Sequence, residues 1–310
     1  MPVQSGILPQ PSVHARFLVL RCRAADEAPA RARLKKCLQH FDATRRRLQM
    51  QYADASLFSV AGFGPALWQQ LAGTMPGGLR ELQPLAGTFA MPASGGDLLL
   101  HIHGDRYDLC FALAQSFMAE SGDLFEVLEE VAGFRYLDSR DLTGFIDGTE
   151  NPQESQGRAE AALLGEEAGV YAHGSFVFAQ RYVHQLDKWQ RLSVDTQEQV
   201  IGRTKLESIE LDDAVKPANA HIARTVIEED GEELEIVRHS MPYGESAGEQ
   251  GLFFIAYTKE LSIIDRMLAR MFGTSGDGSS DRLLNFVTPV GGAYFFAPPV
   301  ALWNAIVAED

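Results

Sequence analysis

The sequence contains few cysteines, no long apolar run and no excess of basic residues. Its 310 residues include only Cys22, Cys37 and Cys110. The number is odd and no two of them form a CxxC pair, which excludes a disulfide framework and predicts reduced, buried thiols. Reduced thiols are typical of a cytoplasmic protein.

Membranes and nucleic acids are also poor candidates for partners. No stretch of about 18 apolar residues exists, so no segment is expected to span a membrane. The N-terminus has neither a basic segment followed by an apolar one nor a twin-arginine motif, which again favours the cytoplasm. Acidic residues outnumber basic ones by 42 to 27, giving a net charge of −15. Because phosphate binding needs a basic surface, nucleic acid is not an expected ligand.

The sequence does contain two similar strand–turn–helix units, at residues 96–120 and 250–273, and Gly273 is placed to cap the end of the second helix. Further strands are predicted at 15–23 and 55–64, with a helix at 26–49 between them. The two units lie about half a chain length apart, which indicates a weak internal duplication. Two such halves predict an α+β fold with antiparallel sheets and helices to one side. The alternative is that two unrelated strand–turn–helix units look alike.

Residues 224–244 predict a hairpin that turns at Asp230 and Gly231. On the return strand the more apolar face carries Leu234, Ile236, Arg238 and Ser240, and His239 lies on the other face. Arg238 is therefore expected to point inward, where a guanidinium needs an anion. Asp147, which follows two large apolar residues in "TGFIDGTENP", is the candidate anion. Alternatively, the strand ends before Arg238 and the side chain reaches solvent.

His101 and His103 are two residues apart and share one face of a predicted strand. A metal ion could bind there, but no third ligand is evident from the sequence. Solvated or hydrogen-bonded strand residues are therefore the favoured interpretation.

Five stretches together resemble the dye-decolourising (DyP-type) haem peroxidases: "GFIDGTENP" (144–152), "IGRTK" (201–205), "NAHIART" (219–225), "IVRHSMPYG" (236–244) and "GGAYFFAPP" (291–299). Their order and spacing match over nearly the whole chain. The resemblance implies two ferredoxin-like halves with antiparallel sheets and peripheral helices, of the dimeric α+β barrel type. The halves are expected at 1–148 and 149–310, the second carrying most of the haem pocket. Without an export signal, the chain resembles the cytoplasmic bacterial subgroup.

The resemblance also implies roles for individual residues. His221 corresponds to the iron ligand, and Asp147 and Arg238 to the catalytic pair on the opposite face of the haem. The residues expected around the cofactor are Gly148, Thr149, Arg203, Ser240 and Asp281. Arg203 would pair with a haem propionate, and Asp281 would accept the second N–H of His221, although Asp277 is a nearby alternative. Ser240 stands where some relatives carry an amide.

The chemistry of peroxide cleavage requires such residue types. A carboxylate can move one proton between the two peroxide oxygens as base and then acid. A fixed guanidinium stabilises the negative charge that develops on the oxygen. Arg238 is also expected to hold Asp147 ionised against the opposing effect of burial.

The implied function is a haem-dependent peroxidase that reduces hydrogen peroxide and oxidises small aromatic reductants, dye-like or phenolic, by one-electron steps. Since no CxxCH motif occurs, the expected cofactor is one non-covalent haem b per chain. A homo-oligomer is expected, and the C-terminal stretch from 302 predicts no docking into a protein shell. The alternatives are a haem carrier or haem-processing protein with incidental peroxidase activity, and a haem-free α+β binding module.

Overall fold

The computed structural model describes residues 2–23 and 27–308, so the last two residues of the C-terminal stretch lie outside it. The first half contains β1 (His14–Cys22), α1 (Ala28–Gln51), β2 (Leu57–Phe63), α2 (Pro65–Ala72), β3 (Leu85–Ala86), β4 (Ala90–Met91), β5 (Leu98–Gly104), α3 (Tyr107–Ser121) and β6 (Phe125–Phe134). The predicted strands and helices are thus present here. The helix expected from residue 26 is described from Ala28, with a proline in its first turn, where the missing N–H costs nothing.

The second half repeats this order with longer insertions. It contains α4 (Ser155–Ala162), η1 (Glu166–Tyr171), β7 (Ser175–His184), α5 (Leu186–Trp189), α6 (Val194–Ile201), α7 (His221–Thr225), β8 (Glu228–Glu229), β9 (Glu232–Glu233), β10 (Val237–Arg238), β11 (Met241–Gly244), β12 (Gln250–Thr258), α8 (Leu261–Phe272), η2 (Arg282–Asn285), β13 (Val287–Pro289), β14 (Ala293–Ala297) and α9 (Val300–Val307). As the sequence predicts, α8 ends at a left-handed glycine, Gly273, with φ of 79°.

The two halves share one antiparallel strand order. In the first half the strands lie in the order β6–β1–β5–β2, and in the second in the order β14–β7–β12 with β10 and β11 beyond β12. Numbered along each half, both orders read four, one, three, two, which is the ferredoxin-like arrangement. The predicted fold class is therefore confirmed. The halves join where Phe63 of β2 pairs with Phe296 of β14.

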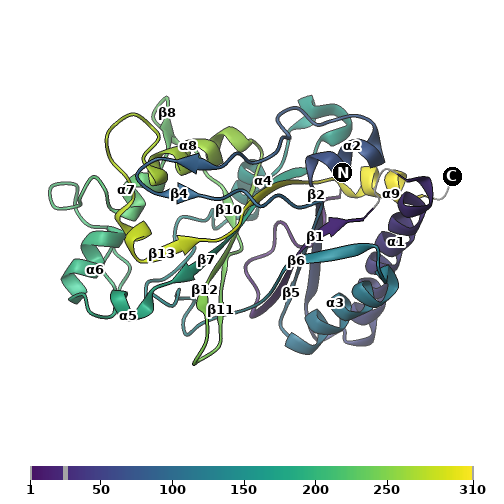
Figure 1. Ribbon diagram of the computed structural model, residues 1–310, viewed down its shortest axis with the longest axis horizontal. Coiled ribbons are helices and arrows are strands. Elements are labelled where there is room, and N and C mark those ends of the chain that lie inside the picture. Colours follow the sequence, from purple (N-terminus) through teal and green to yellow (C-terminus); the bar gives the residue numbers. More distant parts are fainter. Residues whose placement is uncertain (1, 24–26, 309–310) are drawn as a thin grey trace.

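The sheets of the two halves face each other, and the helices cover their outer sides. In Figure 1, α1 and α3 flank the strands on one side of the molecule and α7 and α8 on the other. One apolar core lies under the helices, and a second lies between the sheets. Alternation along a strand sends neighbours to different cores: Phe178 faces the helix side, whereas Val177 faces the interior between the sheets.

The predicted hairpin is interrupted. Strands β8 and β9 have only two residues each. Leu234 still donates its N–H to the Ile227 carbonyl at 2.8 Å, but residues 235 and 236 leave the ladder before β10 begins. The expectation of one continuous return strand is therefore wrong. The apolar side chains of this segment line a cavity instead of continuing the pairing.

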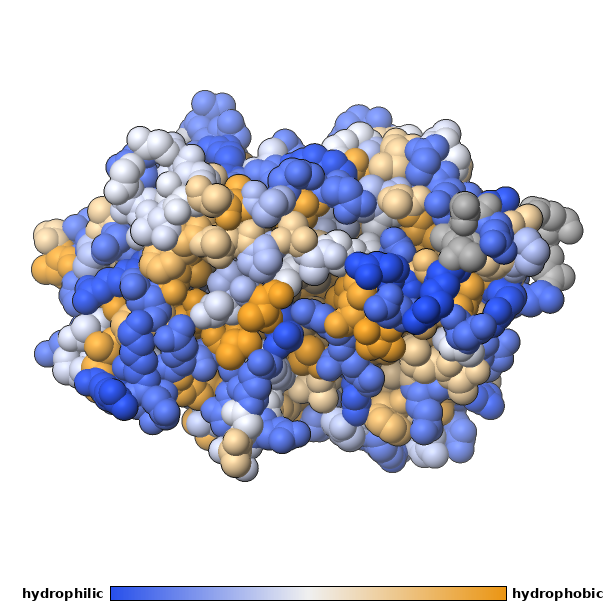
Figure 2. All heavy atoms as spheres, viewed as in Figure 1, coloured by the Kyte–Doolittle hydropathy of each residue, from blue (hydrophilic) through white to orange (hydrophobic). Residues whose placement is uncertain are grey.

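The polarity of the surface and the lengths of the described helices both agree with what the amino-acid composition predicts. Hydrophilic residues cover much of the face seen in Figure 2, with apolar residues between them near its middle. Of the helices in the described ranges, none combines the length and the apolar character that a bilayer crossing needs.

Candidate active site

A large cavity lies between α8 and the outer face of β7 and β12. Together with its open mouth it encloses about 1250 Å³. Most of its wall is apolar and includes Phe178, Ile201, Leu252, Phe254, Ile264, Met267, Leu268, Met271, Leu283 and Val287. Its polar residues include His221, Asp147 with Arg238, and three glutamates, Glu150, Glu233 and Glu235. A wide apolar slot with a few polar groups suits a large, flat, mostly apolar ligand.

His221 begins the short helix α7 and lines this cavity. Its Nδ1 lies 2.6 Å from Oδ2 of Asp281, whose side chain is fully buried. A carboxylate accepts the Nδ1–H, so the lone pair of His221 lies on Nε2. An imidazole oriented in this way is ready to ligate a metal, and the buried carboxylate strengthens it as a donor.

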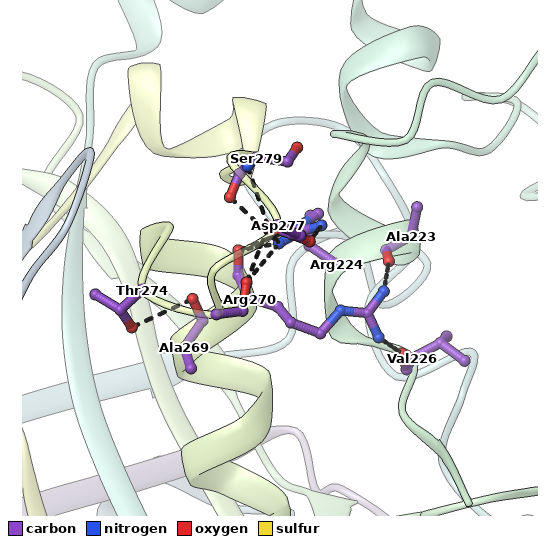
Figure 3. Close-up of polar contacts among 9 residues, drawn as sticks. Ala223, Arg224, Val226, Ala269, Arg270, Thr274, Asp277 and Ser279 are labelled. Atoms are coloured by element: carbon purple, nitrogen blue, oxygen red, sulfur yellow. Dashed lines mark hydrogen bonds and ion pairs between the residues drawn. The ribbon is translucent and has the colours of Figure 1, made fainter.

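A network of arginines holds α7 in position (Figure 3). Arg224, which is buried, donates to Asp277 at 2.7 Å and to the carbonyl of Arg270 at the end of α8. Arg270 in turn donates to the carbonyls of Ala223 and Val226. A five-residue helix has little stability of its own, so these ties fix the position of His221. Asp277 pairs with Arg224, whereas Asp281 contacts the histidine.

Asp147 lies in the loop between β6 and α4, and packing and hydrogen bonds pin this loop in place. Phe145 is buried against Trp189, with ring centroids 6.1 Å apart. The Asp147 N–H donates to the Ser139 carbonyl at 3.0 Å. Gly148 has φ of 80°, a conformation that a residue with a Cβ adopts only with strain. Phe145 is therefore an anchor of the loop, whereas Ile146 lines the cavity.

Asn151 ties this loop to Arg238. Its Nδ2 donates to the Arg238 carbonyl at 2.8 Å, and its Oδ1 accepts the Arg238 N–H at 2.9 Å. The amide thus pairs with the Arg238 backbone as a neighbouring strand would. Asn151 is almost fully buried, so few waters compete for these bonds. In the sequence, Asn151 is distinguished only by standing before a proline, in a dipeptide typical of turns.

Asp147 and Arg238 both line the cavity, and both are half-buried. Among the described side chains, they make no direct ion pair with each other. Burial raises the pKa of Asp147, and the charge of Arg238 opposes this rise without cancelling it. The expectation that Arg238 keeps the carboxyl ionised therefore identified the right partner, but burial is the larger effect.

A second, more polar cavity reaches the same pair. Gly148, Asn151 and Ser240 line it, together with Gln10, Ser12, Ser139 and Gln153. Because Asp147 and Arg238 line both cavities, they lie where the two spaces meet. Ser240 thus faces this smaller space, and its Oγ also accepts the N–H of Ile255 at 3.3 Å.

Acidic residues surround the mouth of the larger cavity. Glu150, Glu233 and Glu235 line it. Arg203 forms an ion pair with Glu150 and lies 3.7 Å from Glu210. Thr149, predicted near the cofactor, belongs to neither of the two linings described here.

A further pair lines the larger cavity without any signal in the sequence. His184 at the end of β7 lies 3.2 Å from Asp141. Burial lowers the pKa of His184, and Asp141 opposes the shift. The two residues are far apart in the sequence and share no motif, so only the fold brings them together.

The residues fit a haem: an apolar slot, an imidazole with a free Nε2 in its wall, and an acid and an arginine beside it. The family models for the N-terminal and C-terminal parts of the Dyp-type peroxidases match residues 4–135 and 138–302. The chain belongs to this family. It is therefore an oxidoreductase, a DyP-type peroxidase.

Individual relatives cover most of both chains. The dye-decolorizing peroxidase of Mycolicibacterium paratuberculosis is 41% identical over 304 residues, which are 96% of this chain and 84% of the relative. The enzyme of Mycobacterium tuberculosis is 42% identical, over 92% of this chain and 85% of the relative. The solved structure of DypB from Rhodococcus jostii superimposes with a TM-score of 0.92 at 38% identity, covering 97% of each chain. Solved variants of DypB contain haem.

Proposed function

We propose that this DyP-type peroxidase binds one non-covalent haem b in the larger cavity, with His221 as the iron ligand and Asp147 and Arg238 as the catalytic pair. The observation that carries the proposal is the shared position of Asp147 and Arg238, on the wall of both cavities. The haem iron, when bound, supplies the centre on which hydrogen peroxide is reduced.

Asp147 moves the proton. Its carboxylate accepts a proton from one oxygen of hydrogen peroxide and returns it to the other oxygen, which leaves as water. This role requires the ionised form before peroxide arrives. Since burial raises the pKa of Asp147, the rate should decline with falling pH earlier than for an ordinary carboxylate.

Arg238 stabilises the negative charge that accumulates on the leaving oxygen. Its backbone is clamped by Asn151, so the guanidinium starts from a fixed point. Asp281 holds the Nδ1 proton of His221 and so strengthens its Nε2 as the donor that would ligate the iron.

The remaining predicted residues have supporting roles. Arg203, which pairs with Glu150 in the structure, would hold a haem propionate in its place, because a guanidinium pairs with either carboxylate. Gly148 and Thr149 bring backbone close to the cofactor, and Ser240 lines the polar cavity through which peroxide enters. The division into residues 1–148 and 149–310 puts His221, Arg238 and most of the pocket in the second half.

Small aromatic reductants deliver single electrons, and the protein acts in the cytoplasm as a homo-oligomer. The three cysteines without disulfide bonds agree with this compartment. A haem carrier would also need His221, but it would have no use for Asp147 and Arg238 together. The catalytic pair therefore favours the peroxidase over the carrier.

Stopped-flow mixing of the ferric holoenzyme with peroxide tests the proposal. Asp147→Asn and Arg238→Leu should keep the Soret band and react roughly 10²-fold more slowly or worse. The exposed residues Asp187 and Arg191 provide matched controls, Asp187→Asn and Arg191→Leu, which should react like the wild type. The decline of the wild-type rate at low pH should disappear in Asp147→Asn. Equal rates in all five proteins would show that Asp147 is only a structural turn residue.

A further inference from the structure

Three histidines meet between the two sheets, away from the haem cavity. His101 and His103 come from β5 in the first half, and His239 follows β10 in the second. All three are at most 1% exposed. One nitrogen of each ring lies within 4.8 Å of those of the other two. As predicted, His239 and Arg238 point to opposite faces. His239 is therefore the third histidine of the cluster, which the sequence alone did not reveal.

Each ring has one nitrogen next to an oxygen that can accept a hydrogen bond from it. His103 Nε2 lies 3.1 Å from the Gly6 carbonyl. His239 Nε2 lies 3.0 Å from both the Ile7 carbonyl and Arg158 Nη2, so metal binding at Nδ1 requires the tautomer in which Nε2 donates to Ile7 instead of accepting from Arg158. His101 Nδ1 lies 2.7 Å from the Tyr257 hydroxyl. Metal-binding histidines characteristically donate their other N–H to an oxygen in this way.

The opposite nitrogens are the candidate ligands. His101 Nε2 and His239 Nδ1 are buried and have no hydrogen-bond partner in the structure. His103 Nδ1 has one competitor, the Ser12 hydroxyl at 2.8 Å. Unpartnered buried nitrogens are costly unless something binds them. The His101 and His103 rings stack with centroids 4.6 Å apart, so binding requires them to turn toward each other.

We propose that His101, His103 and His239 bind one monovalent copper ion between the two sheets. Imidazole nitrogens suit copper, zinc, iron and nickel, so the ligands alone do not choose among these metals. The charge around the site decides between a monovalent and a divalent ion. The three described ligands are neutral, and no carboxylate belongs to the cluster.

Arg158 disfavours a divalent ion at this site. It is 1% exposed, and its Nη2 lies 3.0 Å from His239 Nε2 and 2.8 Å from the Pro9 carbonyl. Its charge repels any cation bound to His239 Nδ1. The free energy needed to remove an ion from water grows with the square of its charge. It is therefore about four times larger for a divalent ion than for Cu⁺. Cu⁺ is therefore the expected occupant, and Zn²⁺ is not.

The N-terminal segment covers the cluster. Besides the Gly6 and Ile7 carbonyls, Ser12 contacts His103, and Arg158 donates to the carbonyls of Leu8 and Pro9. An ion must displace this cover to enter. The Ser12 hydroxyl must also release His103 Nδ1, and this requirement gives a specific test.

The test uses the anaerobic, desalted holoenzyme, incubated with Cu⁺ or with Zn²⁺ and then washed with a chelator of graded strength. Metal retained per chain is measured by mass spectrometry, and the haem is followed separately by its Soret band. The wild type should retain about one more Cu⁺ per chain than His101→Gln or His239→Gln. His40→Gln on α1 is the matched control and should retain the wild-type amount; the side-chain hydrogen bonds of His40 to described residues are with Ser116 and Thr44.

The variant Ser12→Ala gives a more specific test of metal binding. Removing the competing hydrogen bond should tighten Cu⁺ binding roughly two- to tenfold, since metal binding no longer has to break it. A merely structural cluster would show no such gain. X-ray absorption at the copper edge should give a nitrogen-only ligand set; sulfur ligands would indicate the cysteines and overturn the assignment. Equal copper in wild type and His101→Gln, or preferential retention of Zn²⁺, would overturn it as well.

Discussion

Replacing Asn151 by alanine should disturb Arg238 without touching any predicted catalytic atom. The change removes two hydrogen bonds, of 2.8 and 2.9 Å, to the Arg238 backbone. A buried N–H or carbonyl left unpaired costs about 1–3 kcal/mol. Because Arg238 is half-buried, water can restore part of this pairing. We therefore expect the free energy of unfolding to fall by about 2 kcal/mol, which is near the lower end of the range for two unpaired buried groups.

The same change should slow the reaction with peroxide. If misplacement of the Arg238 charge raises the activation free energy by about 1.4 kcal/mol, the rate falls about tenfold. This is a smaller effect than that of Arg238→Leu, because the guanidinium remains. Its pH dependence should keep the decline at low pH, since Asp147 is still present.

The assay combines denaturant unfolding with stopped-flow mixing of the ferric holoenzyme and peroxide at several pH values. Asn304→Ala, an exposed change on α9, is the matched control and should alter neither measurement. Asn151→Asp keeps the acceptor for the Arg238 N–H but puts an oxygen against the Arg238 carbonyl, so it should also slow the reaction. A destabilised Asn151→Ala variant with the wild-type peroxide rate would refute the positioning role.

Three further predictions concern the cavity. His221→Ala should lose haem or bind it weakly, because its bond to iron disappears; haem titration followed by the Soret band measures this. Asp281→Asn should keep haem but raise its reduction potential, since His221 becomes a weaker donor; an unchanged potential would contradict the role given to Asp281. In the haem-free protein, the raised pKa of Asp147 means that ionisation opposes folding once the pH exceeds the ordinary value. Asp147→Asn should therefore melt at a higher temperature than wild type at neutral pH, with the difference vanishing as the pH falls through the folded and then the ordinary pKa.

The sequence predicted the fold well where a local pattern carries the information. Strand and helix periodicity placed β5, α3, β12 and α8, and the glycine after α8 ended that helix as expected. The return strand of the hairpin was the exception. Its alternating pattern put Leu234, Ile236 and Arg238 on one face correctly, but the strand pairing stops after Leu234, and residues 235 and 236 line the cavity without pairing. Periodicity reports which face is apolar, and it does not report whether another strand is available to pair.

The candidate site was predictable only in part, for the same reason. Motifs identified Asp147, Arg238 and His221, whereas the choice between Asp281 and Asp277 as the contact of His221 required coordinates. Tertiary partners with no motif, such as Asn151 on the Arg238 backbone and His184 beside Asp141, left no sequence signal. Each is an ordinary polar residue until the fold brings its partner within reach.

The charge state of Asp147 shows most clearly what one sequence does not determine. The sequence supplied both opposing effects, an arginine that favours the carboxylate and apolar neighbours that oppose it. Deciding between them requires the combined desolvation from every element around the loop, and in the structure burial prevails. A raised pKa is not a defect in a group that must accept a proton and then release it. It moves the pKa of Asp147 toward neutrality, and a carboxylate with a higher pKa is a more effective base.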